Sequence, residues 1–313
     1  MNYKKAKGSM CGAMVIFTFA LSIFSGCHGG NNRPDLDSPE KGTIHISVDE
    51  TFKPVIDSQI QVFEALNPGA HIIADYKPEA DCFRDLIKDS TRMIIVTRGL
   101  TENEEKYYKD SLSFSPTWSK VANDAIAVIV NKNATDSLFT LNRLRGILDG
   151  STGDKQIAVF DGLSATSTVR YAVDSLMHGK PFDPKKVFAE KGSLGVINYV
   201  SQHENVIGFV GVEWIGNKED TSQLSFLKSV KIASLECTCP EQTYIKPYQA
   251  NIMRKRYPLV RGLYYILKEN YNGLGSGFAN FLEYEKGQLI FRRAYLAPTK
   301  MNFTIREATL NTQ

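Results

Sequence analysis

Hydroxyl side chains and a cation gather where a predicted helix begins, in the stretch Gly162-Leu163-Ser164-Ala165-Thr166-Ser167-Thr168-Val169-Arg170-Tyr171. A short apolar run precedes it and predicts a strand, so the order is strand, polar turn, helix. The first backbone N–H groups of a helix have no partners within it and bind oxyanions. Thr166, Ser167 and Thr168 would add hydroxyl donors, and Arg170 a positive charge. The same residue types also make an ordinary N-cap, and capping alone is the alternative interpretation.

The amino terminus has the layout of a secretory signal. Three lysines precede an apolar run, Ala13 to Phe24, which is followed by Ser25-Gly26-Cys27. Small residues before a cysteine resemble a bacterial lipobox, which predicts cleavage before Cys27 and lipid attachment to its thiol. Residues 1–26 would then be a signal peptide and residues 27–42 a polar linker. The alternative is a plain secretory signal in which the cysteine is incidental, and both interpretations predict export.

The composition is that of a globular chain with room for two domains, since it has 313 residues and a hydrophobic content of 42%. Removing residues 1–26 takes away three lysines and no acid, so the formal net charge falls from +3 to zero. That leaves no electrostatic basis for binding nucleic acid. None of the five histidines stands in a Ser-His-Asp or metal-binding pattern, so we expect no enzyme, no cofactor and no metal.

The cysteines that follow Cys27 are odd in number and lack metal-type spacing. Cys237 and Cys239 are separated by one residue, which is too close for an easy mutual disulfide. In an oxidising compartment we therefore expect a bridge from Cys82 to one of them.

The first part of the chain alternates strands with helices. We predict strands over residues 43–48, 71–76 and 93–97, and helices over residues 54–66 and 81–90. This order implies a parallel sheet with crossover helices, whose carboxyl-end loops meet at one crevice. Thr51, Thr97 and Arg98 would lie at that edge.

A second unit of the same kind follows from residue 121. Its predicted strands are residues 124–131, 157–160, 205–210 and 231–235, and its predicted helices are residues 140–148, 168–178 and 195–200. Two further helices are predicted over residues 257–270 and 277–288.

Four stretches together resemble the phosphate-binding proteins of ABC phosphate importers, which have the type II periplasmic-binding fold. They are Val121 to Asn131, Val206 to Gly211, Tyr257 to Arg261, and Gly277-Phe278 with Gly287-Gln288. The resemblance implies an α/β protein of two lobes, each a mainly parallel sheet flanked by helices. Lobe 1 would comprise residues 43–121 and 245–313, lobe 2 residues 122–244, and the ligand would bind in the cleft between them.

The resemblance also implies binding residues. Thr51 matches the family's first phosphate-contacting turn, Thr97 and Arg98 its Ser-Arg turn, and Thr166-Ser167-Thr168 its Ser-Gly-Thr loop. There are two departures from the family pattern. Gly162 stands where the family often has an arginine, so Arg170 or Arg98 would have to replace that guanidinium. Pro78-Glu79-Ala80-Asp81 replaces a Gly-Ser-rich turn, and carboxylates there repel an anion unless they point away.

A carboxylate in the site would distinguish phosphate from sulfate, because only phosphate carries a proton near neutral pH. Asp161, directly before the hydroxyl loop, is one candidate for this acceptor, and Asp49 and Glu50 beside Thr51 are others. Asp161 as a turn residue that bonds its own backbone is the alternative.

The resemblance implies a non-enzymatic receptor that binds phosphate and delivers it to the permease of an ABC importer. We expect a monomer in the periplasm or on the cell surface, held at the membrane by its lipid alone. One alternative is the same fold binding sulfate, molybdate or a phosphorylated small molecule, or serving as a sensor. Another is an exported phosphohydrolase, which would need metal ligands that the sequence does not group together.

Replacing Cys27 with alanine should release the protein from the membrane fraction, because the acyl chains would be its only attachment. Fractionation followed by immunoblotting measures this. A variant that still sediments with membranes after a salt wash contradicts the lipoprotein interpretation.

Overall fold

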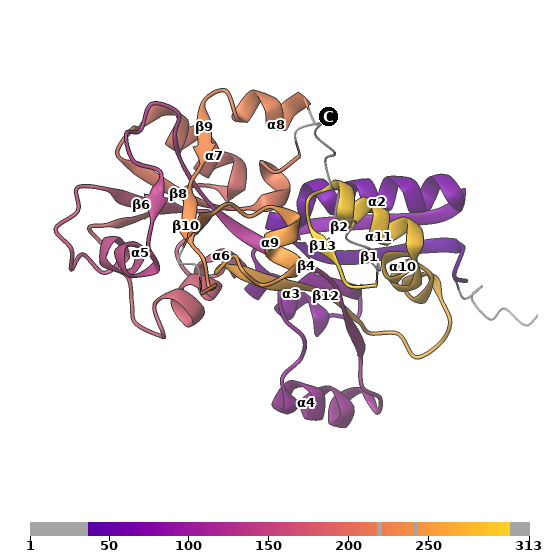
Figure 1. Cartoon of the computed structure of the whole chain (residues 1–313). Helices are drawn as coiled ribbons and strands as arrows, with labels where there is room; N and C mark the ends of the chain where they lie inside the picture. The colour runs from indigo at the N-terminus through magenta and orange to yellow at the C-terminus, as the bar shows by residue number, and fades with distance from the viewer. Residues whose placement is uncertain (1–36, 218–220, 241–242, 301–313) are drawn as a thin grey trace, which may run out of the picture. The chain divides into compact units, whose positions relative to one another are not determined.

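The computed structural model describes residues 37–217, 221–240 and 243–300. Its main element is a mixed sheet with the strand order β2-β1-β3-β12-β4-β8-β6-β7, and β13 and β9 also pair with β4 (Figure 1). The bounds are β1 Lys41–Asp49, β2 Gly69–Lys77, β3 Thr91–Val96, β4 Thr117–Asn131, β6 Ile157–Phe160, β7 Val187–Ala189, β8 Val206–Gly211, β9 Val230–Ile232, β12 Val260–Leu267 and β13 Ala297–Pro298. A small separate sheet has the order β11-β10-β5, with β5 Leu138–Phe139, β10 Ser234–Glu236 and β11 Tyr244–Ile245.

The long strand β4 joins two halves of the main sheet. Residues 117–125 of β4 pair antiparallel with β12, and residues 126–130 pair antiparallel with β8. We call β1, β2, β3 and β12 with their helices the first half, and β6, β7, β8 and β9 with theirs the second half. Within the first half β1 pairs parallel with β2 and β3, and within the second half β6 pairs parallel with β7 and β8. The antiparallel strands β4 and β12 therefore lie at the centre of the sheet, between two parallel groups.

Helices cover both faces of each half (Figure 1). Their bounds are α2 Lys53–Leu66, α3 Glu79–Leu86, α4 Glu102–Leu112, α5 Leu141–Leu148, α6 Ser167–Tyr171, α7 Gly192–Gln202, α8 Thr221–Phe226, α9 Gln249–Met253, α10 Leu274–Glu283 and α11 Glu285–Arg293. Short helical turns occupy η1 Glu50–Phe52, η2 Ala172–Leu176 and η3 Val212–Trp214.

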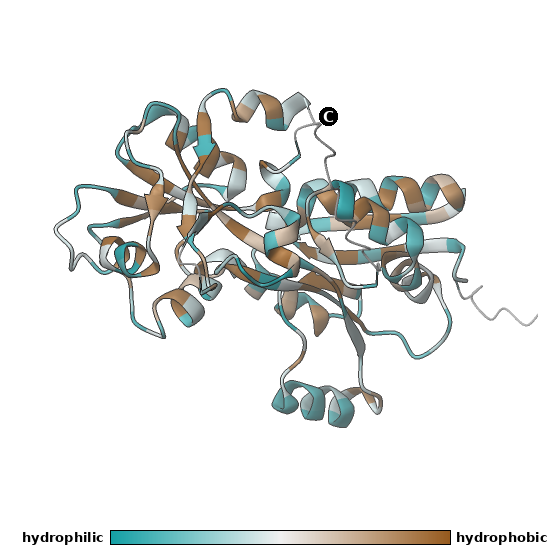
Figure 2. Cartoon of the chain, viewed as in Figure 1, coloured by the Kyte–Doolittle hydropathy of each residue, from teal (hydrophilic) through white to brown (hydrophobic). Residues whose placement is uncertain are grey.

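The period-two alternation of the strands explains the two layers. In β3, Met93 and Ile95 pack into the core under α2, α10 and α11, whereas Ile94 and Val96 pack with α3 on the opposite face. β4 behaves alike in the second half, since its even-numbered residues from Val128 face α5 and α6 and its odd-numbered ones face α7. Hydrophobic residues accordingly fill the sheet, while α4 is mostly hydrophilic (Figure 2).

Of the two helices predicted near the carboxyl end, one is wrong and the other is divided. Residues 260–267 form strand β12 instead of a helix, because Arg261, Leu263 and Tyr265 are buried at every second position. The predicted helix over residues 277–288 is two helices, α10 and α11, which are separated by the extended backbone of Tyr284.

Two other predicted elements are divided in the structure. The helix predicted over residues 168–178 is α6 followed by a turn of π-helix, η2. The strand predicted over residues 231–235 is split between β9 and β10, which belong to different sheets.

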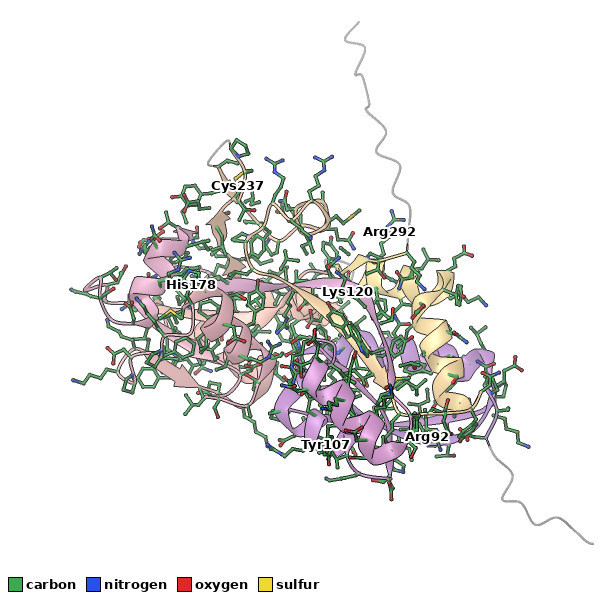
Figure 3. The ribbon with its side chains drawn as sticks, turned by 90° about the horizontal axis from the view of Figure 1, so that it is seen from below. Arg92, Tyr107, Lys120, His178, Cys237 and Arg292 are labelled. Atoms are coloured by element: carbon green, nitrogen blue, oxygen red, sulfur yellow. A yellow bond between two sulfur atoms is a disulfide. The ribbon has the colours of Figure 1, made fainter. Side chains whose placement is uncertain are left out.

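The disulfide prediction is also wrong. Cys237 is bonded to Cys239, and Cys82 is a free cysteine on the buried face of α3. A turn between the two paired cysteines brings their Cα atoms to 5.1 Å, within the range that a disulfide spans. Figure 3 shows Cys237 at the periphery of the molecule, where it directly follows β10 of the small sheet.

Phe160→Ala should lower the free energy of unfolding by about 3–5 kcal/mol, because Phe160 is fully buried and stacks on Phe209 at 4.4 Å between ring centroids. The matched control is Phe188→Ala on the neighbouring strand β7, where the side chain is 44% exposed. Denaturant unfolding of both variants measures the difference, and equal losses would contradict this account of the core.

Candidate functional site

The hydroxyl loop follows β6 and is held by the carboxylate of Asp161. Thr166 Oγ1 donates to Asp161 Oδ1 at 2.7 Å and also caps α6 by accepting from the backbone N–H of Val169 at 3.4 Å. Thr168 Oγ1 donates to Asp161 Oδ2 at 3.1 Å. Burial raises the pKa of Asp161, although the Thr166 hydroxyl and the charge of Arg261 oppose this. Thr166 therefore does serve as an N-cap, and both threonine hydroxyls already have acceptors inside the loop.

Arg261, on β12 in the first half of the sheet, contacts the same loop. The antiparallel register of β12 and β4 places it opposite Asp124, and its Nε donates to Asp124 Oδ2 at 2.7 Å. Its Nη1 donates to Ser167 Oγ at 2.9 Å and approaches Thr168 Oγ1 at 3.4 Å. The arginine is 4% exposed. The sequence does not identify Arg261 as a site residue, because a helix is predicted over residues 257–270. Only in a strand does every second residue point to the same face, which is what buries Arg261.

The turn after β1, residues 49–52, lies against the ion pair of Arg261 and Asp124. Asp49 Oδ1 accepts from the backbone N–H of Thr51 at 3.1 Å, and the Thr51 carbonyl accepts from Trp214 Nε1 at 2.6 Å. A Cβ at Gly211 would lie 2.7 Å from Thr51 Cγ2, so only glycine allows this approach. The same glycine leaves room for the carboxyl of Glu213, which is buried beside it.

Partnerless polar atoms concentrate in this cluster. Among the described residues, seven buried side-chain nitrogen or oxygen atoms lack a hydrogen-bond partner, and six of them belong here. The six are Asp49 Oδ2, Thr51 Oγ1, Asp124 Oδ1, Glu213 Oε1, Glu213 Oε2 and Arg261 Nη2. Buried polar groups are nearly always paired, so such a concentration marks a place built to receive a polar ligand.

The buried carboxyls of the cluster hold protons more tightly than ordinary ones. Burial, and then the charge of Asp124, raise the pKa of Glu213 well above its usual value. A protonated Glu213 donates to Asp124, so these two carboxyl groups are partners of each other. Asp49 Oδ2, Thr51 Oγ1 and Arg261 Nη2 are then the partnerless atoms that a ligand would meet. Burial and the nearby charge of Glu79 raise the pKa of Asp49 to about 7.

A second bridge connects the halves on the side of α3. Arg170 Nε donates to Glu79 Oε2 at 2.6 Å, and Arg170 Nη2 donates to Thr97 Oγ1 at 2.7 Å. Glu79 Oε1 accepts from both the backbone N–H and the hydroxyl of Thr97, at 2.8 and 2.5 Å. The backbone N–H of Ala80 donates to the carbonyl of Ala165 in the hydroxyl loop at 3.1 Å.

The structure thus brings most of the predicted residues together, from both halves of the sheet. They are Thr51, Thr97, Asp161, Thr166, Ser167, Thr168 and Arg170. Arg98 lies outside the cluster, because its guanidinium donates to Glu104 at 2.8 and 2.9 Å and stacks on Phe83 at 3.8 Å. Cys27 lies outside the described residues.

Two further features bear on the chemistry of the site. Glu50 is turned toward α7, where its carboxylate accepts from the backbone N–H of Ser193 at 3.3 Å and from its hydroxyl at 3.2 Å. In the described part of the chain, no three His, Cys, Asp or Glu side chains form a group that would hold a metal ion, and no helix is long and apolar enough to cross a membrane.

Two parallel sheet groups joined by shared central strands, with polar residues of both groups meeting in one buried cluster, define the class of two-lobed α/β solute-binding proteins. The chain belongs to the PBP superfamily, whose domain model matches residues 34–284. The type II periplasmic-binding fold expected from the sequence is therefore confirmed.

Individual relatives agree with this assignment. The phosphate-binding protein PstS of Pseudomonas aeruginosa is 26% identical over 255 residues, which cover 75% of each chain. A structure from Clostridium perfringens, assigned as a phosphate ABC transporter substrate-binding protein and holding phosphate, superposes with a TM-score of 0.67 at 18% identity and covers 83% of this chain and all of that one. An ABC-type phosphate transport receptor from Vibrio cholerae gives a TM-score of 0.61 at 16% identity, covering 82% of this chain and all of that one.

Glu213→Gln should remove a pH-dependent loss of stability. The folded protein keeps a proton on Glu213 at pH values where the unfolded chain has lost it, so stability declines as pH rises through that interval. In that interval the wild type should lose up to about 1.4 kcal/mol per pH unit relative to the variant.

Denaturant unfolding at about pH 5, 6 and 7 tests this, with Glu102→Gln on the exposed face of α4 as the control. A constant difference between Glu213→Gln and the wild type across these pH values would show that Glu213 is already ionised in the folded protein.

Proposed function

We propose that the chain is an exported receptor that captures inorganic phosphate in the buried cluster and delivers it to the permease of an ABC importer. The phosphate-binding relatives support this, together with a cluster that contains donors for an oxyanion and an acceptor for its proton. The role is capture and release, without bond chemistry. Cys27 would carry the lipid anchor, and residues 27–42 would tether the folded part to the membrane.

The observation that carries the proposal is the mixture of the partnerless atoms. Arg261 Nη2 and Thr51 Oγ1 can donate to an anion, whereas Asp49 Oδ2 can only accept unless it is protonated. A phosphate that keeps a proton satisfies donors and acceptor together. Sulfate brings acceptors alone. At pH values above the pKa of Asp49, which is about 7, it leaves a buried carboxylate unpaired, which a polar site penalises by roughly 10⁴-fold or more. Asp49 therefore fits the acceptor role best, since both oxygens of Asp161 and of Glu50 accept from protein donors, whereas Asp49 Oδ2 has none.

The two halves of the sheet would act as the two lobes, for which the sequence predicts residues 43–121 with 245–313 and residues 122–244. The core of the second half also includes Ile252, Tyr257 and Leu259, so the chain would return to the first lobe at β12. Asp49 and Thr51 come from the first, and Ser167 comes from the second. A ligand that contacts both favours the closed arrangement by its differential affinity for it. Arg261 takes the place of the guanidinium missing at Gly162, because it is buried, donates to Ser167 through Nη1 and retains an unpaired Nη2.

Thr51→Val should weaken phosphate binding by about 1–3 kcal/mol, because it deletes a hydroxyl donor to a charged, desolvated ligand and keeps the side-chain volume. Isothermal titration calorimetry with phosphate and with sulfate measures this, and the wild type should bind phosphate and reject sulfate.

Thr91→Val is the matched control, since Thr91 is also buried but lies at the opposite end of β3 from Thr97. Sulfate bound by the wild type as tightly as phosphate would rule out the phosphate assignment. Equal affinities for the Thr51 and Thr91 variants would place the ligand elsewhere.

A further inference from the structure

Glu79 occupies donors that an anion would otherwise use. It stands at the first position of α3 and is 3% exposed. Its carboxylate takes the backbone N–H and the hydroxyl of Thr97, and it forms an ion pair with Arg170 at 2.6 Å. Thr97 and Arg170 are two of the residues that the sequence predicts to bind the anion. The Glu79 carboxylate therefore occupies the position where a second negative charge of the ligand would otherwise bind.

The charges around Glu79 leave no surplus cation. Arg170 faces it from α6, Asp49 lies near it at the end of β1, and Arg98 interacts with it only at longer range because Glu104 holds its guanidinium. On its own helix, the Cys82 thiol lies close enough to interact electrostatically with it. Burial acts to raise the pKa of Glu79, but Arg170 and the two Thr97 donors outweigh burial and hold that pKa below its ordinary value. The group is therefore ionised at neutral pH.

The other guanidinium is neutralised in the same way. Arg261 is paired with Asp124 at 2.7 Å, and Asp161 lies across the same loop. Each arginine of the cluster thus has its own buried carboxylate. A dianion entering this site meets at least as much negative as positive charge, and like charges placed together at a desolvated site cost several kcal/mol.

We propose, building on the phosphate-receptor function, that Glu79 sets the charge of the accepted ligand: the site takes the singly charged, doubly protonated oxyanion, dihydrogen phosphate, in preference to dianions. One hydroxyl of such a ligand donates to a Glu79 oxygen, which is ionised at both pH values compared below. Asp49 Oδ2, which has no partner, faces the ligand as a protonated carboxyl below its pKa of about 7 and as an acceptor above it. The phosphate oxygens without protons accept from Arg261 Nη2 and Thr51 Oγ1. Glu79 is in this sense a specificity-determining residue, placed in a turn that departs from the family pattern.

The test compares phosphate binding by calorimetry at about pH 5.5, where phosphate is mainly the monoanion, and at about pH 8.5, where it is mainly the dianion. The wild type should bind at least about 10-fold more tightly at the lower pH. Glu79→Gln keeps the shape and an acceptor for Thr97 but removes the charge. It should bind phosphate about 10-fold more tightly than the wild type at the higher pH, and it should bind sulfate measurably. The gap, by which we mean the ratio of phosphate affinities at the two pH values, should narrow to about threefold.

Asp174→Asn is the matched control. Asp174 is the other carboxylate on Arg170, at 3.4 Å, but its side chain is 58% exposed and screened by water. This variant should keep the wild-type gap. Arg170→Gln supplies the opposite change, since it removes the compensating cation and keeps Glu79, and it should widen the gap. Thermal melting by circular dichroism establishes that each variant is folded.

The outcomes separate this inference from the proposed function. A wild type that binds phosphate at neither pH overturns both. A wild type that binds phosphate, with the same gap in Glu79→Gln, overturns the inference and leaves the receptor function standing. Loss of binding by folded Glu79→Gln at both pH values also overturns it, because Glu79 would then be an obligatory ligand contact. If Glu79→Gln does not fold, a narrowed gap in Arg170→Gln overturns the inference.

Discussion

The buried pair of Arg261 and Asp124 is the interaction on which the rest of the site depends. It arises from the register of two antiparallel strands, β12 and β4, and both side chains are almost fully excluded from water. A buried ion pair is not in itself a source of stability, since its desolvation offsets most of its attraction, but the loss of one partner is strongly destabilising. The pair therefore fixes the guanidinium where β4 passes from one half to the other, and the hydroxyl loop and the Thr51 turn are arranged around it.

The fold could largely be predicted from the sequence, because the β-α-β order and the apolar strands are local patterns. The failures have physical causes. β12 alternates tyrosine, arginine and aliphatic residues, which on its own does not distinguish a strand from a helix face. The same error hid Arg261, since its burial depends on pairing with a strand about 137 residues away. Arg98 is predicted from the sequence to bind the ligand but is paired with Glu104, which is only six residues away. The sequence does not show this pairing, because it depends on where α4 places Glu104.

In the hydroxyl loop, helix capping occurs together with contacts to residues that are distant in the sequence. Thr166 caps α6, as a plain N-cap would, yet its hydroxyl also holds Asp161, and Ser167 next to it contacts Arg261. Capping and ligand binding do not exclude each other when a helix begins at an interface between two halves. The residue types in such a turn are therefore weak evidence for ligand binding by themselves. The stronger evidence is which residues from distant parts of the chain contact the turn.

Because the two halves share β4, their unfolding is coupled. Residues 117–125 of β4 pair with β12, and residues 126–130 pair with β8. If either half unfolded alone, the part of β4 that pairs with it would become an unpaired strand in the remaining half. Partial opening therefore has to begin at the outer strands, β2 and β7, and proceed inward. The amide hydrogens in the middle of β4 would be the last to exchange with solvent, and the two halves would lose their structure together in spite of having separate cores.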